Sequence, residues 1–87
     1  MDASTPSAVS TLTMYSTTWC GYCHRLKRQL RQEGITFDEV DIETDRGAAT
    51  LVERANRGYR TVPTLVFADG SALTNPSIAQ VKAQLAS

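Results

Sequence analysis

Two cysteines separated by two residues are the side chains in this sequence best suited to chemistry. Cys20 and Cys23 lie in a Trp-Cys-Gly-Tyr-Cys segment and are the only cysteines among the 87 residues. Their spacing is typical of a thiol pair that cycles between dithiol and disulfide, or of half a zinc site. Tetrahedral zinc needs four ligands, and His24 is the only histidine, so a zinc site within one chain is disfavoured. A metal cluster shared between two chains stays open.

The two cysteines occupy different positions on a predicted helix. Cys23, Leu26 and Leu30 fall at i, i+3 and i+7, which indicates an amphipathic helix from about Gly21 to Glu33. Cys20 then lies at the helix N-terminus, where unpaired N–H groups and the helix dipole favour a thiolate. Cys23 lies on the buried face. We therefore predict that Cys20 is the nucleophile and that Cys23 is the resolving thiol.

The elements that position this motif are predicted from apolar periodicity. Alternating or apolar runs indicate strands at about 10–16, 36–42, 64–68 and 71–73, and the Asp-Gly pair at 69–70 indicates a hairpin. A second helix carries Ala48, Leu51, Val52 and Ala55 on one face and is capped by Thr44 or Asp45. The last helix follows Asn75 as cap and Pro76 as its first residue, with Ile78, Val81 and Leu85 on its apolar face.

This order of strand, helix, strand, helix, strand, strand, helix predicts an α/β fold. A strand, a helix and a second strand joined by short links pair in parallel with a right-handed crossover, whereas the hairpin is antiparallel. We expect a four-stranded mixed sheet with three flanking helices on its two faces. Residues 1–8 are small and polar and predict a flexible leader, and residues 9–87 predict one domain.

Charge and hydropathy exclude several functional classes. Nine basic and nine acidic residues give a formal net charge of zero, which disfavours nucleic-acid binding. No apolar run is long enough to cross a membrane, and the first residues do not form a signal peptide, so we expect a cytoplasmic protein. The local excess of positive charge lies on the first helix and adds a weaker pull on the Cys20 thiolate, from Arg25, Lys27, Arg28 and Arg31.

A second motif, Thr61-Val62-Pro63-Thr64, precedes the third predicted strand, where a proline disturbs no ladder hydrogen bond. A CxxC pair at a strand–helix junction together with such a proline resembles the thioredoxin fold, and within it the glutaredoxin family, over about residues 10–85. The resemblance implies a cis Val62-Pro63 bond packed against the redox motif. It also implies that Val62 is the edge that docks a thiol peptide, and that Tyr22 matches the aromatic residue of the family's motif.

The sequence departs from the glutaredoxins that use glutathione at both ends of the expected ligand site. Their lysine three residues before the first cysteine is replaced by Thr17, and their Gly-Gly-x-Asp stretch by Leu-Thr-Asn-Pro at 73–76. Pro76 has no N–H to donate and no carboxylate to pair with an ammonium group. The groups left near the expected groove are neutral and suit a polyhydroxylated ligand: Thr17, Thr61, Thr74 and Asn75.

Three segments resemble the mycoredoxin branch of the family, at 19–23, 60–64 and 67–77. The resemblance implies reduction of mixed disulfides between proteins and mycothiol, a cysteinyl pseudodisaccharide. Cys20 would take mycothiol onto itself, and a second mycothiol or Cys23 would release it. Mycothiol would be a co-substrate regenerated by mycothione reductase and NADPH, with no cofactor bound to this chain. We expect a monomer whose Trp19 helps to dock mycothiolated proteins.

Two other functions remain open at this point. The first is a redoxin that receives electrons from thioredoxin reductase and passes them to a specific reductase, although the tail motif typical of those proteins is absent. The second is a dimeric carrier of an iron–sulfur cluster, since Gly21 replaces the proline usual in the family and leaves the helix start less rigid.

Overall fold

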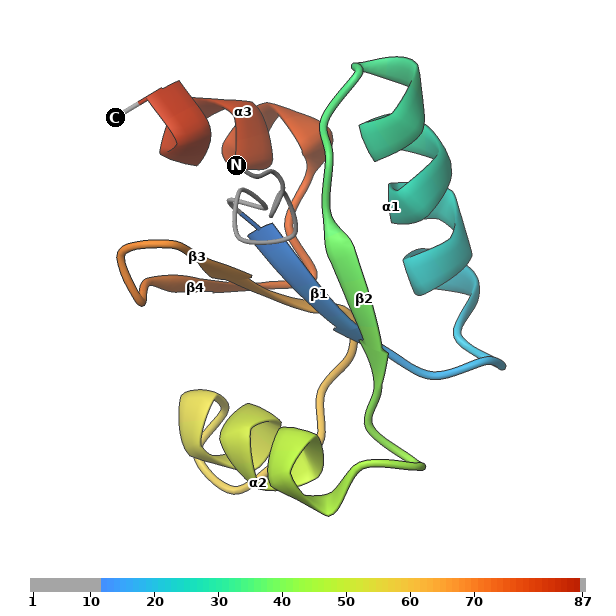
Figure 1. The fold of residues 1–87 in the computed structure, drawn as a ribbon, viewed down its shortest axis with the longest axis vertical. Helices are drawn as coiled ribbons and strands as arrows, with labels where there is room; N and C mark the ends of the chain where they lie inside the picture. Colours follow the sequence, from blue (N-terminus) through green and yellow to red (C-terminus); the bar gives the residue numbers. More distant parts are fainter. Residues whose placement is uncertain (1–11, 87) are drawn as a thin grey trace, which may run out of the picture.

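Four strands form a mixed sheet of order β2-β1-β3-β4 in the computed structural model, which describes residues 12–86 (Figure 1). The strands are β1 (Leu12–Ser16), β2 (Asp38–Asp41), β3 (Thr64–Phe67) and β4 (Ala72–Thr74). The helices are α1 (Gly21–Gln32), α2 (Arg46–Ala55) and α3 (Ile78–Ala86). The predicted order of elements is confirmed. The predicted leader at 1–8 lies outside the described residues.

The central strand β1 carries both kinds of pairing. It runs parallel to β2, with Met14 opposite Glu39, and antiparallel to β3, with Met14 opposite Leu65. β3 in turn pairs with β4 in the predicted antiparallel hairpin. Because α1 connects two parallel neighbours, the end of β1 and the start of α1 are fixed at the same edge of the sheet.

Each face of the sheet has its own apolar core. Leu12 and Met14 of β1 pack with buried residues of α1 and α3, whereas Tyr15 packs against α2 on the opposite face. Figure 1 shows α1 and α3 in its upper half and α2 in its lower half. Alternation along β1 thus places α1 and α3 together over one face. No helix within residues 12–86 is long and apolar enough to span a bilayer.

The predicted start of the last helix is wrong by two residues. α3 begins at Ile78, and Ser77 caps it: the Gln80 N–H donates to Ser77 Oγ at 3.1 Å and the Ser77 N–H donates to Gln80 Oε1 at 2.8 Å. This reciprocal arrangement is a capping box. Asn75 instead has a φ of 45° and donates its N–H to the carbonyl of Pro63 at 2.7 Å. The hydrogen bond to the loop before β3, rather than a role as helix cap, fixes the conformation of Asn75.

The cap of α2 provides a test of this fold. Asp45 Oδ1 accepts the N–H of Ala48 at 3.0 Å, so of the two predicted caps the structure uses Asp45. We expect Asp45→Ala to lower the free energy of unfolding by about 1 kcal/mol, which lowers the thermal midpoint by about 4–8 °C. Thr44→Ala is the matched control and should stay within about 0.5 kcal/mol of the wild type. Equal losses in the two variants, measured by urea unfolding, would contradict the assignment.

Candidate active site around Cys20 and Cys23

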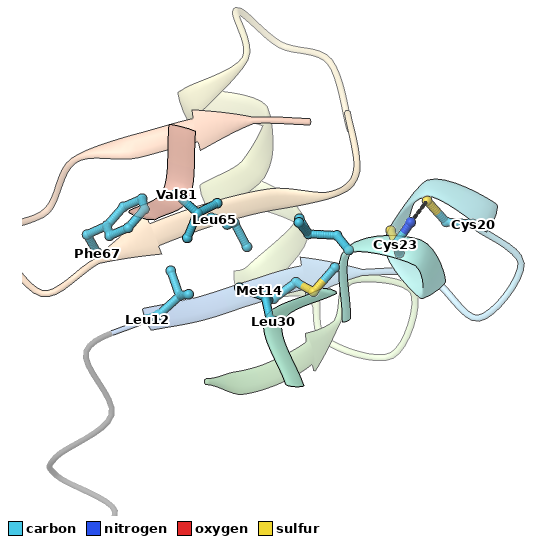
Figure 2. Packing of buried hydrophobic residues seen from close by; sticks show 9 residues of the cluster. Leu12, Met14, Cys20, Cys23, Leu30, Leu65, Phe67 and Val81 are labelled. Atoms are coloured by element: carbon cyan, nitrogen blue, oxygen red, sulfur yellow. Dashed lines mark hydrogen bonds between the residues drawn. The ribbon is translucent and has the colours of Figure 1, made fainter. Parts of the chain in front are cut away.

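Cys20 is the N-cap of α1, and its sulfur occupies the position that a capping oxygen normally takes. Its backbone is extended, with φ −83° and ψ 110°, and its Sγ accepts the N–H of Cys23 at a distance of 3.1 Å (Figure 2). A hydrogen bond from a helix N-terminal amide stabilises a sulfur anion more than a neutral thiol. The predicted position of Cys20 at the helix N-terminus is confirmed.

Cys23 lies one turn further along α1 and is fully buried, whereas Cys20 keeps 5% of its surface exposed. It packs in the same core as Leu26, Leu30 and Met14. Burial, with a smaller contribution from the hydrogen bond to Cys20, raises the pKa of Cys23 to about 12. A thiol with that pKa is ionised in about one molecule in 10⁵ at pH 7. The two thiols are free in this structure and are not equivalent.

The loop before β3 approaches Cys20 from the opposite side. The Val62–Pro63 peptide bond is cis, as the resemblance implied, and Cys20 Sγ lies 3.9 Å from the carbonyl oxygen of Val62. The N–H of Val62 makes no hydrogen bond to any residue in the range 12–86. A free N–H at this place can pair with the backbone of an extended peptide.

Two aromatic side chains flank the cysteines at the surface. Trp19 is 70% exposed and Tyr22 is 64% exposed. The indole N–H of Trp19 donates to Glu43 Oε2 at 3.0 Å, which fixes one edge of the ring to the segment between β2 and α2. Large exposed aromatic rings beside a reactive group are a common feature of contact surfaces. The sequence contained no signal for the partner Glu43.

The polar residues predicted for substrate binding separate into two groups. The Thr74 hydroxyl donates to Asn56 Oδ1, and Asn56 Nδ2 donates to Thr64 Oγ1 at 3.1 Å. The Thr64 hydroxyl donates to the Thr61 carbonyl at 2.7 Å. This network joins the C-terminal end of α2 to β3 and β4, and sequence reasoning missed Asn56 because nothing local distinguishes it. Asn75, by contrast, lines an open groove that it shares with Tyr22.

Thr17 does not reach that groove. Its side chain is buried, and its Oγ1 makes no hydrogen bond within residues 12–86. It lines a different cavity, together with Lys27 and Glu39. There Lys27 Nζ lies 2.9 Å from Glu39 Oε2, and Ser16 Oγ donates to the same oxygen at 2.7 Å. Partial burial alone would raise the pKa of Glu39, but these hydrogen bonds and the Lys27 charge hold it below its ordinary value.

Three of the four cations of α1 lie in different surroundings. Lys27 pairs with Glu39, and Arg31 lies over the ring of Phe37 at 5.8 Å from its centroid. Arg25 lines the groove beside Tyr22. Across residues 12–86, no cluster of three or more His, Cys, Asp or Glu side chains is placed to hold a metal ion.

The difference between the two thiols predicts selective alkylation. At about pH 7, iodoacetamide should modify Cys20 and leave Cys23 unmodified, because Cys23 is both buried and protonated. In a Cys20→Ser variant, the rate of Cys23 modification should rise roughly tenfold per pH unit up to about pH 11. Peptide mapping by mass spectrometry measures both rates. Equal modification of the native cysteines would contradict the assignment, and guanidinium-unfolded protein serves as the control in which they react alike.

Comparison with known proteins agrees with this geometry. The sequence profile of the glutaredoxin family matches residues 12–72. A Mycobacterium tuberculosis protein assigned to the glutaredoxins is 61% identical over 74 residues, which cover 85% of this chain and 88% of that one. Mycoredoxin 1 of Corynebacterium glutamicum is 39% identical over 77 residues, covering 88% and 95%.

Solved structures give the same answer for the fold. The glutaredoxin of Methanosarcina mazei superimposes with a TM-score of 0.76 at 23% identity, covering 87% of this chain and 78% of that one. The predicted thioredoxin-like fold is confirmed. The chain thus combines a matching family profile, a thioredoxin-like sheet and a CxxC pair at the start of α1. It belongs to the glutaredoxin family of thiol-disulfide oxidoreductases.

Proposed function

We propose that this glutaredoxin reduces mixed disulfides between proteins and mycothiol, as a monomer. The observation that carries the proposal is the segment after β4, where Asn75 and Pro76 stand in place of a carboxylate and free N–H groups. An ammonium group at the γ-glutamyl end of glutathione would find no counter-ion there. The 39% identity to Mycoredoxin 1, over 95% of that protein, supports the same co-substrate.

The first step is attack by the Cys20 thiolate on the mycothiol sulfur of the mixed disulfide. The disulfide bond between the protein sulfur and the mycothiol sulfur breaks, the protein leaves as a thiolate that takes a proton from water, and mycothiol becomes bonded to Cys20 through a new disulfide. The N–H of Cys23 donates to the Cys20 sulfur and holds it at the helix start for attack. The peptide on each side of the target cysteine is proposed to pair with the free N–H of Val62 and to rest on Trp19.

The second step releases mycothiol from Cys20. A second mycothiol thiolate attacks the mycothiol sulfur, which forms mycothiol disulfide and returns Cys20 as a thiolate. In the alternative route, Cys23 attacks the Cys20 sulfur, frees mycothiol and forms a Cys20–Cys23 disulfide. Burial of Cys23 and its raised pKa slow that route at neutral pH.

Electrons reach the cycle through mycothiol itself. We propose that mycothione reductase and NADPH regenerate mycothiol, so that the chain needs no bound cofactor. The partners are then mycothiol and mycothiolated proteins. The chain itself orients the mixed disulfide and supplies the Cys20 sulfur.

The proposal predicts a substrate preference that survives loss of the second cysteine. Cys23→Ser should keep at least about half of the wild-type rate on a mycothiolated model peptide, because the main route does not use Cys23. Cys20→Ser should lose more than about a thousandfold, because no other thiolate is available. The same peptide carrying glutathione should react at least tenfold more slowly. A tenfold difference corresponds to roughly the free energy of one lost hydrogen bond to a charged group. Release of mycothiol, followed by mass spectrometry, gives the rates.

Two results would overturn the proposal. One is faster turnover of the glutathionylated than of the mycothiolated peptide. The other is no turnover of either peptide together with reduction of the protein by thioredoxin reductase, which would make the chain a donor of electrons from protein to protein.

A further inference from the structure

The loop before β3 has few backbone hydrogen bonds of its own, although it carries Val62 to the side of Cys20 (Figure 1). None of the backbone N–H groups at 60–62 makes a hydrogen bond within residues 12–86. The Val62 side chain packs against the apolar cores on both faces of the sheet. The position of this loop therefore depends on that packing and on the groups that bind its carbonyl oxygens.

The carbonyl groups on either side of Val62 each accept a hydrogen bond. The Thr64 hydroxyl donates to the Thr61 carbonyl at 2.7 Å. The Asn75 N–H donates to the Pro63 carbonyl, also at 2.7 Å. Val62 thus lies between two anchored residues, one held by a side chain of β3 and one by the backbone after β4.

Asn56, the C-cap of α2, is bonded to the residues that carry both anchors. Its Nδ2 donates to the Val52 carbonyl at 2.8 Å and to Thr64 Oγ1 at 3.1 Å. Its Oδ1 accepts the hydroxyl of Thr74, which precedes Asn75. Both N–H groups and the oxygen of one amide are therefore used. A carboxylate cannot replace this amide, because it has no proton to donate to the Val52 carbonyl.

The buried Thr64 hydroxyl links Asn56 to the loop. Thr64 has no exposed surface, and its hydroxyl has two partners within residues 12–86, Asn56 as donor and the Thr61 carbonyl as acceptor. A hydroxyl that accepts from Asn56 directs its own proton away from that side, toward Thr61. Loss of the Asn56 donor leaves the hydroxyl free to rotate, so the anchor on Thr61 weakens.

A loop that is ordered before binding favours the binding of an extended peptide. Fixing the backbone of a residue costs conformational entropy, and a loop already held in its bound conformation loses little of it on binding. A peptide that pairs with the free N–H of Val62 uses the loop as a strand edge. The order of residues 61–63 then affects how tightly the peptide is held.

We propose that Asn56 is a positioning residue that holds the loop before β3 ready for the protein half of a mixed disulfide. It acts through Thr64 and Thr74 and does not touch the substrate. The inference rests on the docking of a peptide at Val62 in the proposed function, and it does not depend on mycothiol as the co-substrate.

The test measures an exchange equilibrium at Cys20 in a Cys23→Ser variant, which cannot close the intramolecular disulfide. Protein that carries β-mercaptoethanol on Cys20 is mixed with a peptide that contains one cysteine. The peptide thiolate attacks the Cys20 sulfur, the disulfide to β-mercaptoethanol breaks, and β-mercaptoethanol leaves as a thiolate that takes a proton from water. Mass spectrometry of the two protein forms at known thiol concentrations gives the exchange constant. β-Mercaptoethanol has no backbone to pair with Val62, so the constant measures docking of the peptide.

Asn56→Asp keeps the size of the side chain, removes both donors and should lower the exchange constant about five- to tenfold, roughly the effect of one lost hydrogen bond. Thr64→Val should lower it by a similar factor and carries the test if Asn56→Asp does not fold. The double variant should lie within about twofold of the weaker single variant, because both residues act in one network. Asp45→Ala is the matched control, since it weakens α2 at its other end. It should stay within about twofold of the Cys23→Ser protein.

An unchanged constant in both Asn56→Asp and Thr64→Val, or an equal fall in Asp45→Ala, would overturn the inference. A Cys23→Ser protein that holds the peptide no better than β-mercaptoethanol would also overturn it, because nothing would then be docked at Val62. Failure of mycothiol as the co-substrate gives a different result, namely no release of mycothiol from the mycothiolated peptide by the wild type. The exchange constants are still measured in that event.

Discussion

The hydrogen bond from the Cys23 N–H to the Cys20 sulfur connects the fold to the chemistry of this protein. A helix start normally uses a hydroxyl or carboxylate oxygen to satisfy its first amides, and here a sulfur takes that role. Cys20 is therefore both the cap of α1 and the thiol that we propose as the nucleophile. The turn before it is closed by the bond from the Cys20 N–H to the Thr17 carbonyl at 3.4 Å. A covalent bond formed at this sulfur therefore changes the group that caps the first turn of α1.

Both thiols are buried, but Cys23 has no exposed surface and Cys20 keeps a small exposed fraction. The same helix that exposes Tyr22 to solvent turns Cys23 into the core between α1, β1 and β3, where its neighbours are apolar (Figure 2). Desolvation disfavours the charged form of Cys23, so its buried sulfur stays a thiol. The Cys20 sulfur, at the helix end, accepts a hydrogen bond from the N–H of Cys23. One turn of helix thus separates the proposed nucleophile from the proposed resolving thiol.

The segment between β4 and α3 is joined by a hydrogen bond to the loop that faces Cys20. Asn75 adopts a left-handed conformation because its N–H binds Pro63, in the loop that faces Cys20. The following capping box of Ser77 and Gln80 then starts α3 independently. This arrangement leaves the side chain of Asn75 facing the groove rather than capping the helix. A single backbone hydrogen bond thus places the edge of this groove relative to the cis-proline loop.

Local periodicity by itself determined the order of elements, the position of Cys20 at a helix start and the burial of Cys23. These features depend on neighbours within one or two turns, and the sequence carries that information directly. The sequence predicted Asn75 as the cap of α3, and only the tertiary structure showed that Ser77 takes this role, since the partner of the Asn75 N–H lies in the Pro63 loop. The Asn56 network and the groove lined by α1 and residues 75–78 also needed the fold, because they join segments far apart in the chain. Such contacts leave no periodic signal in the sequence.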